Sequence, residues 1–368
     1  MNELPQPFAS RLVEVRKGMA AAGLSALLIV RPANRLYLSG YSARDSQLDE
    51  SAGCLLLTPK RQYLLTDSRY RLQAEKEAAG YEVLIYQAGP AKLAAELAGP
   101  ADLKRIGVED DYLTVRQQRL LAEEKLETVP LPGLLDDLRT IKDQTEIRAI
   151  VRALRLTERA LARIMRRLEP GQTEIETARR LNEAMIELGA DEPAFETIVA
   201  SGPNSAMPHA QPTRRKFRPD EPIIFDCGAR WRGYGADITR TVVLGRPKPW
   251  LKRIYHLVRR AQLQAIEAIR PGIMSHEVDG VSRRIIEDGG FGPNFGHGLG
   301  HGVGLATHEP PALSPRKSTL LKPGMVVTVE PGIYLPGRGG VRLEEMVVVT
   351  EKGRRLLNQD RSFHDWPD

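Results

Sequence analysis

The 368-residue sequence lacks the features of a secreted or membrane-spanning protein. Its two cysteines, Cys54 and Cys227, are far apart and too few for a disulfide framework, a content typical of a reducing compartment. The apolar run LSALLIV at residues 24–30 is too short to cross a bilayer. The first residues contain no apolar core of the kind that a signal peptide needs. We therefore expect a cytoplasmic protein.

The sequence also has no large excess of charge of one sign. Its 53 lysines and arginines are interspersed with 47 aspartates and glutamates, which leaves a net charge of +6. The pair Arg166 and Arg167, like the pair Arg259 and Arg260, stands in a helical pattern and is typical of a solvated helix face. We therefore expect no nucleic-acid partner and no membrane partner.

The first 135 residues alternate between helical and strand-like patterns. Helices are expected over residues 10–22 and 67–80, and the sequences SALLIV, GCLLLT, QYLLT and YEVLIY are expected to form strands. Such alternation predicts an α/β layer. Pro130, Pro132 and Gly133 then break the pattern. We place a boundary near Leu138, which gives an N-terminal domain over residues 1–138 and a second domain over residues 139–368.

The second domain contains a weak internal echo. A long helix that begins with a capping box at Asp143 and Glu146 ends at a Pro-Gly pair, and a short helix then ends at Gly189. Residues 249–290 repeat this order of long helix, Pro-Gly pair, short helix and glycine stop. Each copy precedes strand-like sequence that is rich in reactive side chains. The echo predicts two related halves, with a site where their sheets meet.

Two aspartates stand in an expected β-hairpin over residues 223–243, IIFDCGARWRGYGADITRTVV. Asp226 and Asp237 lie almost symmetrically about its glycine-rich turn, and directly opposed residues have Cβ atoms ~5 Å apart. The alternative interpretation is a pair of solvated loop aspartates. Apolar neighbours on both strands argue against it, because two buried carboxylates repel unless a cation lies between them.

Two glutamates add to this pair. In GMVVTVEPG, Glu330 shares a strand face with Val326 and Thr328. In GGVRLEEMVVVT, we expect Arg342 and Glu344 on one face of a second strand. Glu345 would then lie on the opposite face, as a structural or solvated residue. Four carboxylates and one histidine make a hard, oxygen-rich site that suits two divalent cations rather than one. Cations that share carboxylates and a water are the arrangement of two-metal hydrolases.

The one histidine of this expected metal site would come from residues 295–311, FGHGLGHGVGLATHEPP, which contain three histidines. In an extended segment, His297 and His301 share one face and the opposite face is glycine, which allows close approach of backbone or substrate. A glycine-rich phosphate loop is the alternative, but GxGxxG does not fit and no GK[ST] follows. Glycines interleaved with His297, His301 and His308 favour a catalytic site.

These blocks resemble the signature blocks of the pita-bread-fold metallopeptidases. GHGLGHGVGLATHEPP, DCGARWRGYGADITRT, VEPGIY, GVRLEEM and PAFETIVASGPNSAMPHA are similar to the Xaa-Pro branch, aminopeptidase P and prolidase, over residues 140–355. The N-terminal part more loosely resembles the creatinase-like domain of these enzymes. The resemblance implies an α+β chain, with a C-terminal pita-bread domain of two pseudo-symmetric halves and an N-terminal creatinase-like α/β domain.

The resemblance also implies a ligand set for two divalent metal ions, with Mn or Co favoured and Zn or Fe as alternatives. Asp226 would chelate one metal, Asp237 and Glu344 would bridge both, and His301 and Glu330 would complete the other. A bridging hydroxide would be the nucleophile, and Glu330 would move its proton.

Four further residues receive roles from the same resemblance. His209 and His308 would flank the scissile carbonyl and stabilise the oxyanion. Arg342 would orient Glu344 or contact substrate. His297 would lie on the substrate side, with a packed core histidine as the alternative.

Three departures from the branch pattern affect the expected substrate. Ala306 stands where an acidic residue is usual, Ala312 stands where many dipeptidases carry arginine, and the loop at residues 40–53 is poorer in glycine than usual. Without that arginine, tripeptides and longer peptides should be cleaved at least as well as dipeptides. The leading hypothesis is therefore a dimeric Xaa-Pro aminopeptidase that acts on proline-containing peptides.

Four alternatives to this hypothesis were weighed. The first is an Xaa-Pro dipeptidase, or prolidase. The second is methionine aminopeptidase, against which the N-terminal domain and the PNSAMPH block argue. The others are a metal-free creatinase-type hydrolase and a non-catalytic binding module of the same fold; the presence of all five ligand positions disfavours both.

Overall fold

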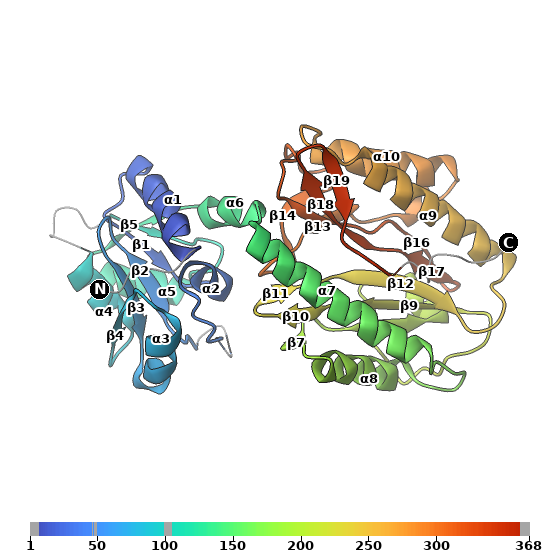
Figure 1. Cartoon of the computed structure of the whole chain (residues 1–368), viewed down its shortest axis with the longest axis horizontal. Helices are drawn as coiled ribbons and strands as arrows, with labels where there is room; N and C mark the ends of the chain where they lie inside the picture. Colours follow the sequence, from blue (N-terminus) through green and yellow to red (C-terminus); the bar gives the residue numbers. More distant parts are fainter. Residues whose placement is uncertain (1–6, 46, 48–49, 99–104, 361–368) are drawn as a thin grey trace. The chain divides into compact units, whose positions relative to one another are not determined.

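The structure is a computed structural model that describes residues 7–45, 47, 50–98 and 105–360. The chain forms two compact units, an N-terminal unit of Met1–Arg139 and a C-terminal unit of Thr140–Asp368 (Figure 1). Among the described residues, no helix combines the length and the apolar character that crossing a bilayer requires.

The N-terminal unit contains a six-stranded sheet with the order β4-β3-β2-β1-β5-β6. The pairs β1–β2 and β2–β3 are antiparallel, and the pairs β1–β5, β3–β4 and β5–β6 are parallel. Its strands are β1 (Ala26–Ile29), β2 (Cys54–Leu57), β3 (Gln62–Thr66), β4 (Glu82–Ile85), β5 (Arg105–Val108) and β6 (Glu127–Pro130). Its helices are α1 (Phe8–Ala21), α2 (Pro32–Ser39), η1 (Ser68–Tyr70), α3 (Arg71–Glu77), α4 (Pro90–Leu97), α5 (Val115–Glu123) and α6 (Leu134–Thr140).

Burial explains why the central strands of this sheet were visible in the sequence. Every residue of β1 and β2 is buried, so both read as continuous apolar runs. The expected helix over residues 67–80 is divided into η1 and α3, with Asp67 accepting a hydrogen bond from the Arg69 amide at its start. Strands β5 and β6, which the sequence analysis did not predict, are short, and β6 has no buried residue.

The C-terminal unit is built from two halves. The first half has helices α7 (Gln144–Met165) and α8 (Glu174–Glu187), the turn η3 (Gly202–Ala206), and a sheet with the order β12-β9-β8, formed by β8 (Ile198–Ser201), β9 (Pro222–Cys227) and β12 (Ile238–Val243). A small sheet of β7 (Glu192–Pro193), β10 (Ala229–Trp231) and β11 (Tyr234–Gly235) adjoins it.

The second half repeats the order of long helix, short helix and sheet. Its helices are α9 (Pro249–Ala268), α10 (Ser275–Asp288) and η4 (Gly292–Asn294). Its main sheet has the order β14-β13-β15-β18-β19 and contains β13 (Gly300–Gly302), β14 (Glu309–Leu313), β15 (Val326–Val329), β18 (Glu345–Thr350) and β19 (Gly353–Leu356). Strands β16 (Gly332–Leu335) and β17 (Gly339–Arg342) form a separate pair.

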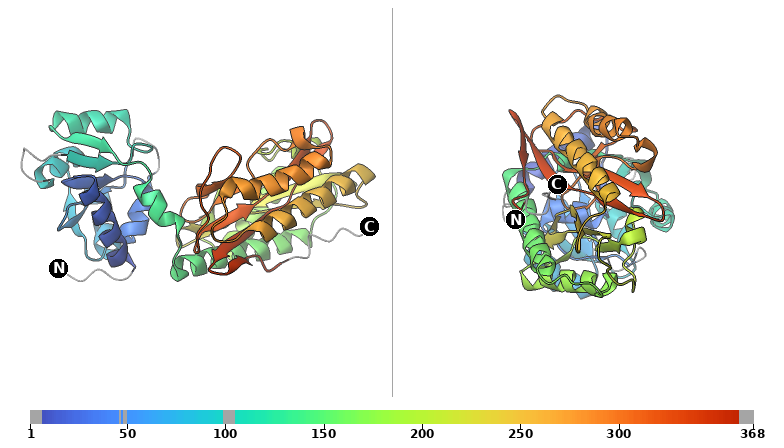
Figure 2. Two further views of the ribbon diagram at one scale, coloured as in Figure 1. Left: turned by 90° about the horizontal axis from the view of Figure 1, so that it is seen from above. Right: turned by 90° about the vertical axis from the view of Figure 1, so that its right-hand side faces the viewer.

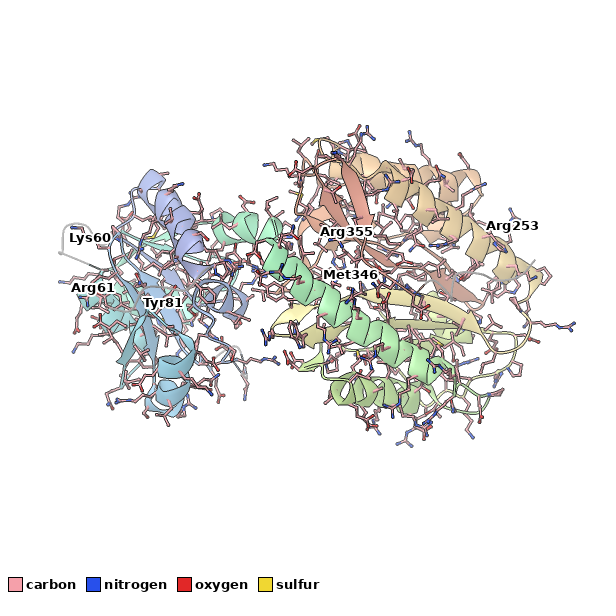
Figure 3. All side chains as sticks on the ribbon, viewed as in Figure 1. Lys60, Arg61, Tyr81, Arg253, Met346 and Arg355 are labelled. Carbon is pink, nitrogen blue, oxygen red and sulfur yellow. The ribbon has the colours of Figure 1, made fainter. Side chains whose placement is uncertain are left out.

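In Figures 1 and 2 the strands of the C-terminal unit lie between α7 and α8 on one side and α9 and α10 on the other. Each pair of helices covers its own buried cluster. Met346 of β18, labelled in Figure 3, shares a cluster with Ile150 and Leu154 of α7. The two layers of helices therefore bury the sheets between them and leave the strand ends to form a cavity.

Local sequence sets the ends of these helices as expected. Asp143 accepts hydrogen bonds from the amides of Thr145 and Glu146, and the Glu146 carboxylate accepts one from the Asp143 amide. Gly189, at φ 101°, follows the end of α8 in the left-handed conformation that glycine adopts without strain. The predicted capping box and glycine stop are therefore confirmed.

Candidate metal centre

Strand ends from both halves converge on a cavity of about 580 Å³ in the C-terminal unit. The first half contributes Asp226, in β9, and Asp237, directly before β12. The second half contributes His301, in β13, and Glu330, directly after β15. All four side chains line the cavity. The fifth predicted ligand, Glu344, lies between β17 and β18 and is 1% exposed.

The structure corrects two details of the sequence-based picture. Strands β9 and β12 pair as a hairpin, but Asp226 lies opposite Thr239 rather than opposite Asp237. The two aspartates are thus diagonal neighbours, for which a separation of ~7–8 Å is usual instead of ~5 Å. Arg342 and Glu344 do not share one strand, because β17 ends at Arg342 and β18 begins at Glu345. Glu345 is buried beside Arg240, at 3.7 Å, as expected of a structural residue.

Glycine makes the position of His301 possible. A Cβ atom at Gly300 would collide with the Thr328 carbonyl oxygen of β15, and one at Gly302 would collide with the Pro310 carbonyl oxygen of β14. Strand β13 therefore fits between its neighbours only with glycine on both sides of His301. Gly296 has open space at the same position, whereas a Cβ atom at Gly298 would crowd the Leu313 carbonyl oxygen and one at Gly304 would collide with the Glu309 carboxylate, so the close approach extends from Gly298 to Gly304.

Three of the predicted ligands offer atoms that lie within 4.8 Å of one another, namely Asp237, His301 and Glu344. His301 Nε2 lies 3.7 Å from Asp237 Oδ2 and 3.2 Å from Glu330 Oε1. Asp226 is held at the edge of this group, because its Oδ2 accepts a 2.6 Å hydrogen bond from Arg342. The five residues therefore form one connected group around a tighter core of three.

Three carboxylates of the site each have one oxygen that lacks a hydrogen-bond donor among the described residues. These atoms are Asp226 Oδ1, Asp237 Oδ1 and Glu344 Oε1. A buried carboxylate oxygen without a donor is strongly destabilising. Divalent cations would satisfy all three, and oxygen ligands with one imidazole suit Mn, Co, Zn or Fe. The residues present therefore fit a metal site.

Electrostatics supports the same conclusion. Burial raises the pKa of Asp237 well above its ordinary value, and the charges of Glu344 and Asp226 raise it further. Burial and the charges of Glu330 and Asp226 likewise raise the pKa of Glu344, and burial raises that of Asp226. The charge of Arg342 beside Asp226 only partly offsets these effects, so further positive charge would stabilise the group.

Glu330 differs from the other carboxylates. Burial alone would raise its pKa, but the hydrogen bond from His301 and the charges of His301, His297 and Arg342 lower it to about 2. Thr328 also donates a 3.2 Å hydrogen bond to Glu330 Oε1 and accepts one from the His301 amide. A single threonine hydroxyl therefore fixes both residues in position.

A hydrogen-bonded chain connects His297, in the cavity wall, to the carboxylates. His297 Nδ1 lies 2.7 Å from the Gly298 carbonyl, so Nδ1 carries the proton and Nε2 accepts from the Tyr334 hydroxyl at 2.9 Å. The same hydroxyl accepts from Arg342 at 2.9 Å. Burial raises the pKa of Tyr334 to about 12 and lowers the pKa of His297, so both are neutral near pH 7.

Arg342 links this chain to two carboxylates. It donates to Asp226 directly and to the Thr239 hydroxyl, which donates to Glu344 at 2.8 Å. Sequence analysis missed Tyr334 and the Asp226 partner. Tyr334 is part of the VEPGIY block, but an aromatic residue at this position is equally typical of the hydrophobic core, so the sequence does not indicate a role in the site. The Asp226 contact spans 116 residues of sequence, and no local pattern encodes it.

The remaining histidines lie on the open side of the cavity. The rings of His301 and His308 have centroids 4.2 Å apart. Burial and the charge of His301 lower the pKa of His308. His209, which is exposed, lines the same cavity. Arg342 is the one lysine or arginine among the described residues that line the cavity, and Ala312 is part of its wall.

Comparisons with known proteins agree with this architecture. Residues 148–351 match the model of Metallopeptidase family M24, and residues 11–141 match the Creatinase/Prolidase N-terminal domain. The chain is 35% identical to the Xaa-Pro dipeptidase of Pyrococcus horikoshii over 345 residues, which cover 92% of this chain and 94% of that protein.

Two solved structures extend the comparison. The Xaa-Pro dipeptidase from Bacillus anthracis has a TM-score of 0.90 and 35% identity over 96% of this chain and 98% of the other. The X-Pro aminopeptidase from Thermotoga maritima has a TM-score of 0.84 and 34% identity over 94% of this chain and 99% of the other. The expected α+β fold, a pita-bread domain with a creatinase-like N-terminal domain, is therefore confirmed. The chain belongs to Metallopeptidase family M24.

Proposed function

We propose that the protein is an Xaa-Pro dipeptidase that depends on two divalent metal ions. The observation that carries this proposal is the group of buried carboxylates around His301, three of which have an oxygen without a donor. Sequence analysis put Xaa-Pro aminopeptidase first. Dipeptidases are prominent among the similar proteins, with 35% identity for Pyrococcus horikoshii and 33% for Pyrococcus furiosus, and they favour the alternative.

Asp226, Asp237, His301, Glu330 and Glu344 would hold the metal ions. Ions bound there would polarise the scissile carbonyl and lower the pKa of a water molecule. The protein groups position these ligands by neutral or cationic contacts. Arg342 orients Asp226, and Thr239 orients Glu344.

Glu330 is the proposed proton carrier. Its carboxylate lines the cavity and is held by His301 and Thr328. It would accept a proton from the attacking water and donate it to the proline nitrogen as the bond breaks. The proline nitrogen, like any amide nitrogen, must be protonated to leave as an amine, and Glu330 would supply that proton.

The open-side histidines are the proposed oxyanion donors. His308 and His209 line the same cavity as Glu330, and neither belongs to the core of three ligands. Each would donate a hydrogen bond to the carbonyl oxygen as it becomes negative. His297, neutral and held by Tyr334, would contact the substrate from the opposite wall.

A second candidate is an Xaa-Pro aminopeptidase for longer peptides. Ala312 supports it, because the wall offers no arginine there for the terminal carboxylate of a dipeptide. The similarity to the Thermotoga maritima X-Pro aminopeptidase also supports it. We further propose a cytoplasmic homodimer, with residues 1–138 as an accessory domain and residues 139–368 as the catalytic domain.

The test is a panel of Xaa-Pro dipeptides and Xaa-Pro-Xaa tripeptides, assayed after chelation and readdition of Mn²⁺, Co²⁺ or Zn²⁺. We expect about two ions per chain by elemental analysis, no activity without metal, and kcat/KM for dipeptides at least tenfold above that for tripeptides. Equal or faster tripeptide cleavage would establish the second candidate. Replacing Pro by Ala in the substrate should nearly abolish turnover, and activity with no bound metal would exclude both candidates.

A further inference from the structure

One face of α7 carries a row of arginines that takes no part in the cavity. Their spacings of four, three, four, four and three residues place them on one side of the helix over a length of about 27 Å. All of them are exposed. The row consists of Arg148, Arg152, Arg155, Arg159, Arg163 and Arg166, and Arg167 follows it.

Little negative charge offsets this row. The two glutamates of α7, Glu146 and Glu158, are both buried. Arg163 has a surface ion pair with Glu187 on α8 at 2.5 Å, and such exposed pairs contribute little. Within residues 105–360, no ion pair involves Arg152, Arg155 or Arg159. Like charges three and four residues apart destabilise a helix, so the row is costly unless an anion binds it.

The fold does not require such a row. Helix α9 has the equivalent place in the second half, but its basic residues are gathered at positions 252–253 and 259–260. Arg253 stacks on Phe291, and Arg259 donates to Gln262. Figure 3 shows Arg253 near the start of α9, away from α7. A continuous row is therefore a property of α7 itself.

The row borders two hollows in the surface. The larger has a volume of about 700 Å³, and the smaller, between α7 and α8, about 180 Å³. Five of the arginines line the larger hollow together with Glu158, Gln359 and Asp360. Arg180 of α8 joins Arg163 and Arg167 around the smaller hollow, beside Glu183 and Glu187. Cations thus outnumber acids in both hollows.

Further positive charge adjoins the end of the row. Gln172 donates to the Arg167 carbonyl oxygen and accepts from the Phe217 amide, which holds the loop at residues 213–218 against this end of α7. Arg214, Lys216 and Arg218 of that loop are exposed. The basic surface therefore continues beyond α7 for another loop.

We propose that this basic surface binds the phosphate backbone of single-stranded nucleic acid. Guanidinium groups pair with phosphate oxygens through two parallel hydrogen bonds, and a row of them matches a linear polyanion. The row borders two hollows, and a flexible single strand can bend along them, whereas a duplex is stiff over this length.

Two features of the surface set the character of this binding. No large exposed apolar side chain is found on α7, which disfavours a bilayer, because membrane-surface helices also insert apolar residues. No aromatic residue stands in the row to stack on bases, so binding should be independent of sequence. The overall charge balance concealed this surface, because acidic residues elsewhere offset it.

The test measures the affinity of the full chain for a labelled 20-nucleotide oligouridine RNA by fluorescence polarisation. The variant is the triple substitution Arg152→Gln, Arg155→Gln and Arg159→Gln. The matched control is Arg260→Gln, Arg270→Gln and Arg284→Gln, which removes the same charge from exposed positions in the second half. Thermal unfolding of all three proteins verifies that the substitutions leave the fold intact.

We expect a plot of log affinity against log salt to have a slope of about −3 for the unsubstituted chain, as four or five phosphate contacts produce. The row variant should bind at least tenfold more weakly, with a slope shallower by about 2. The control should bind within about twofold. Equal losses in both variants would reduce the effect to net charge and overturn the proposal. So would tighter binding of a duplex, or binding confined to phosphatidylserine vesicles.

Discussion

Each half of the C-terminal unit has a buried carboxylate on its shorter helix that anchors a segment of the cavity, but the two carboxylates are satisfied differently. In the first half, Glu174 on α8 accepts hydrogen bonds from the amide and hydroxyl of Ser201, from Asn204, and from the amide and hydroxyl of Thr213. All these donors are neutral. These contacts anchor the segment that carries His209.

In the second half, Asp279 on α10 accepts from the Leu299 amide at 2.9 Å and pairs with Arg283. Arg283 in turn donates to the carbonyl oxygens of Phe295 and His297. These contacts anchor the segment that carries His297 and His301. Both carboxylates are almost completely buried, yet every oxygen of each has a donor.

This comparison distinguishes two kinds of buried carboxylate. Glu174 and Asp279 are satisfied by protein donors and hold loops in place. Asp226, Asp237 and Glu344 each keep an oxygen without a donor, which is the property of a metal ligand. Burial alone does not identify the site, since all five are buried or nearly so. The site is identified by carboxylates that have such an oxygen and also converge with His301 on one cavity.

The largest expected effect comes from breaking the ligand group itself. His301→Ala should lose metal and all measurable activity, because His301 belongs to the core of three ligand residues. His209→Ala and His308→Ala should retain metal and lower kcat by roughly 10²–10³, the usual effect of removing one oxyanion donor. Elemental analysis measures the metal content of each variant, and steady-state kinetics measures its kcat.

His276→Ala, on the surface of α10, is the matched control. Metal loss in His308→Ala with retention in His301→Ala would reverse the assignment.

The next prediction distinguishes the two buried carboxylates that hold loops in place, Glu174 and Asp279. Asp279→Asn leaves Arg283 without its partner in a mostly buried site and should destabilise the fold by about 3–5 kcal/mol. Glu174→Gln breaks no ion pair but replaces an acceptor with a donor that faces Asn204 and Thr213, and should cost about 2–3 kcal/mol. Hydrogen exchange offers a local measurement, because the Leu299 and Ser201 amides donate to these carboxylates. Exchange that accelerates equally at both amides in each variant would show global loosening instead.

Sequence reasoning located the residues of the site better than their contacts. Asp226, His301 and Glu330 stand in contiguous blocks whose residue types reveal their chemistry. The pairing of Arg342 with Asp226 depends on how β17 approaches β9, which no local pattern encodes. Asp237 is offset from Asp226 because the hairpin turns at Arg232 and Gly233, a register that pairs Asp226 with Thr239, and the sequence pattern does not fix which residues form the turn.

The same limit applies to the fold. Helix ends were predictable because capping is local, as at Asp143 and Gly189. Strands β1 and β2 were predictable because they are buried on both faces, whereas β6 was not, because none of its residues is buried and two of the four are polar. The arginine row on α7 was visible as separate charges, but its continuity became evident only with the burial of Glu146 and Glu158.

The smallest expected effect concerns Tyr334, which links His297 to Arg342 in the second half. Tyr334→Phe removes a hydroxyl that donates to His297 and accepts from Arg342. Arg342 keeps Asp226, Thr239 and the Pro208 carbonyl oxygen, so metal content should change little. Loss of such an outer partner typically lowers activity 10–100-fold, and we expect the lower end.

The pKa of His297 provides a second readout for this variant. Burial holds that pKa below its ordinary value, and the Tyr334 hydroxyl stabilises the neutral ring by donating to Nε2. Without the hydroxyl the neutral form loses a partner, so the pKa should rise. NMR titration of labelled histidine can follow it, since the chain has only seven histidines. An unchanged His297 pKa together with unchanged kcat/KM would show that Tyr334 only packs, and that the chain from His297 to Arg342 has no part in positioning the site.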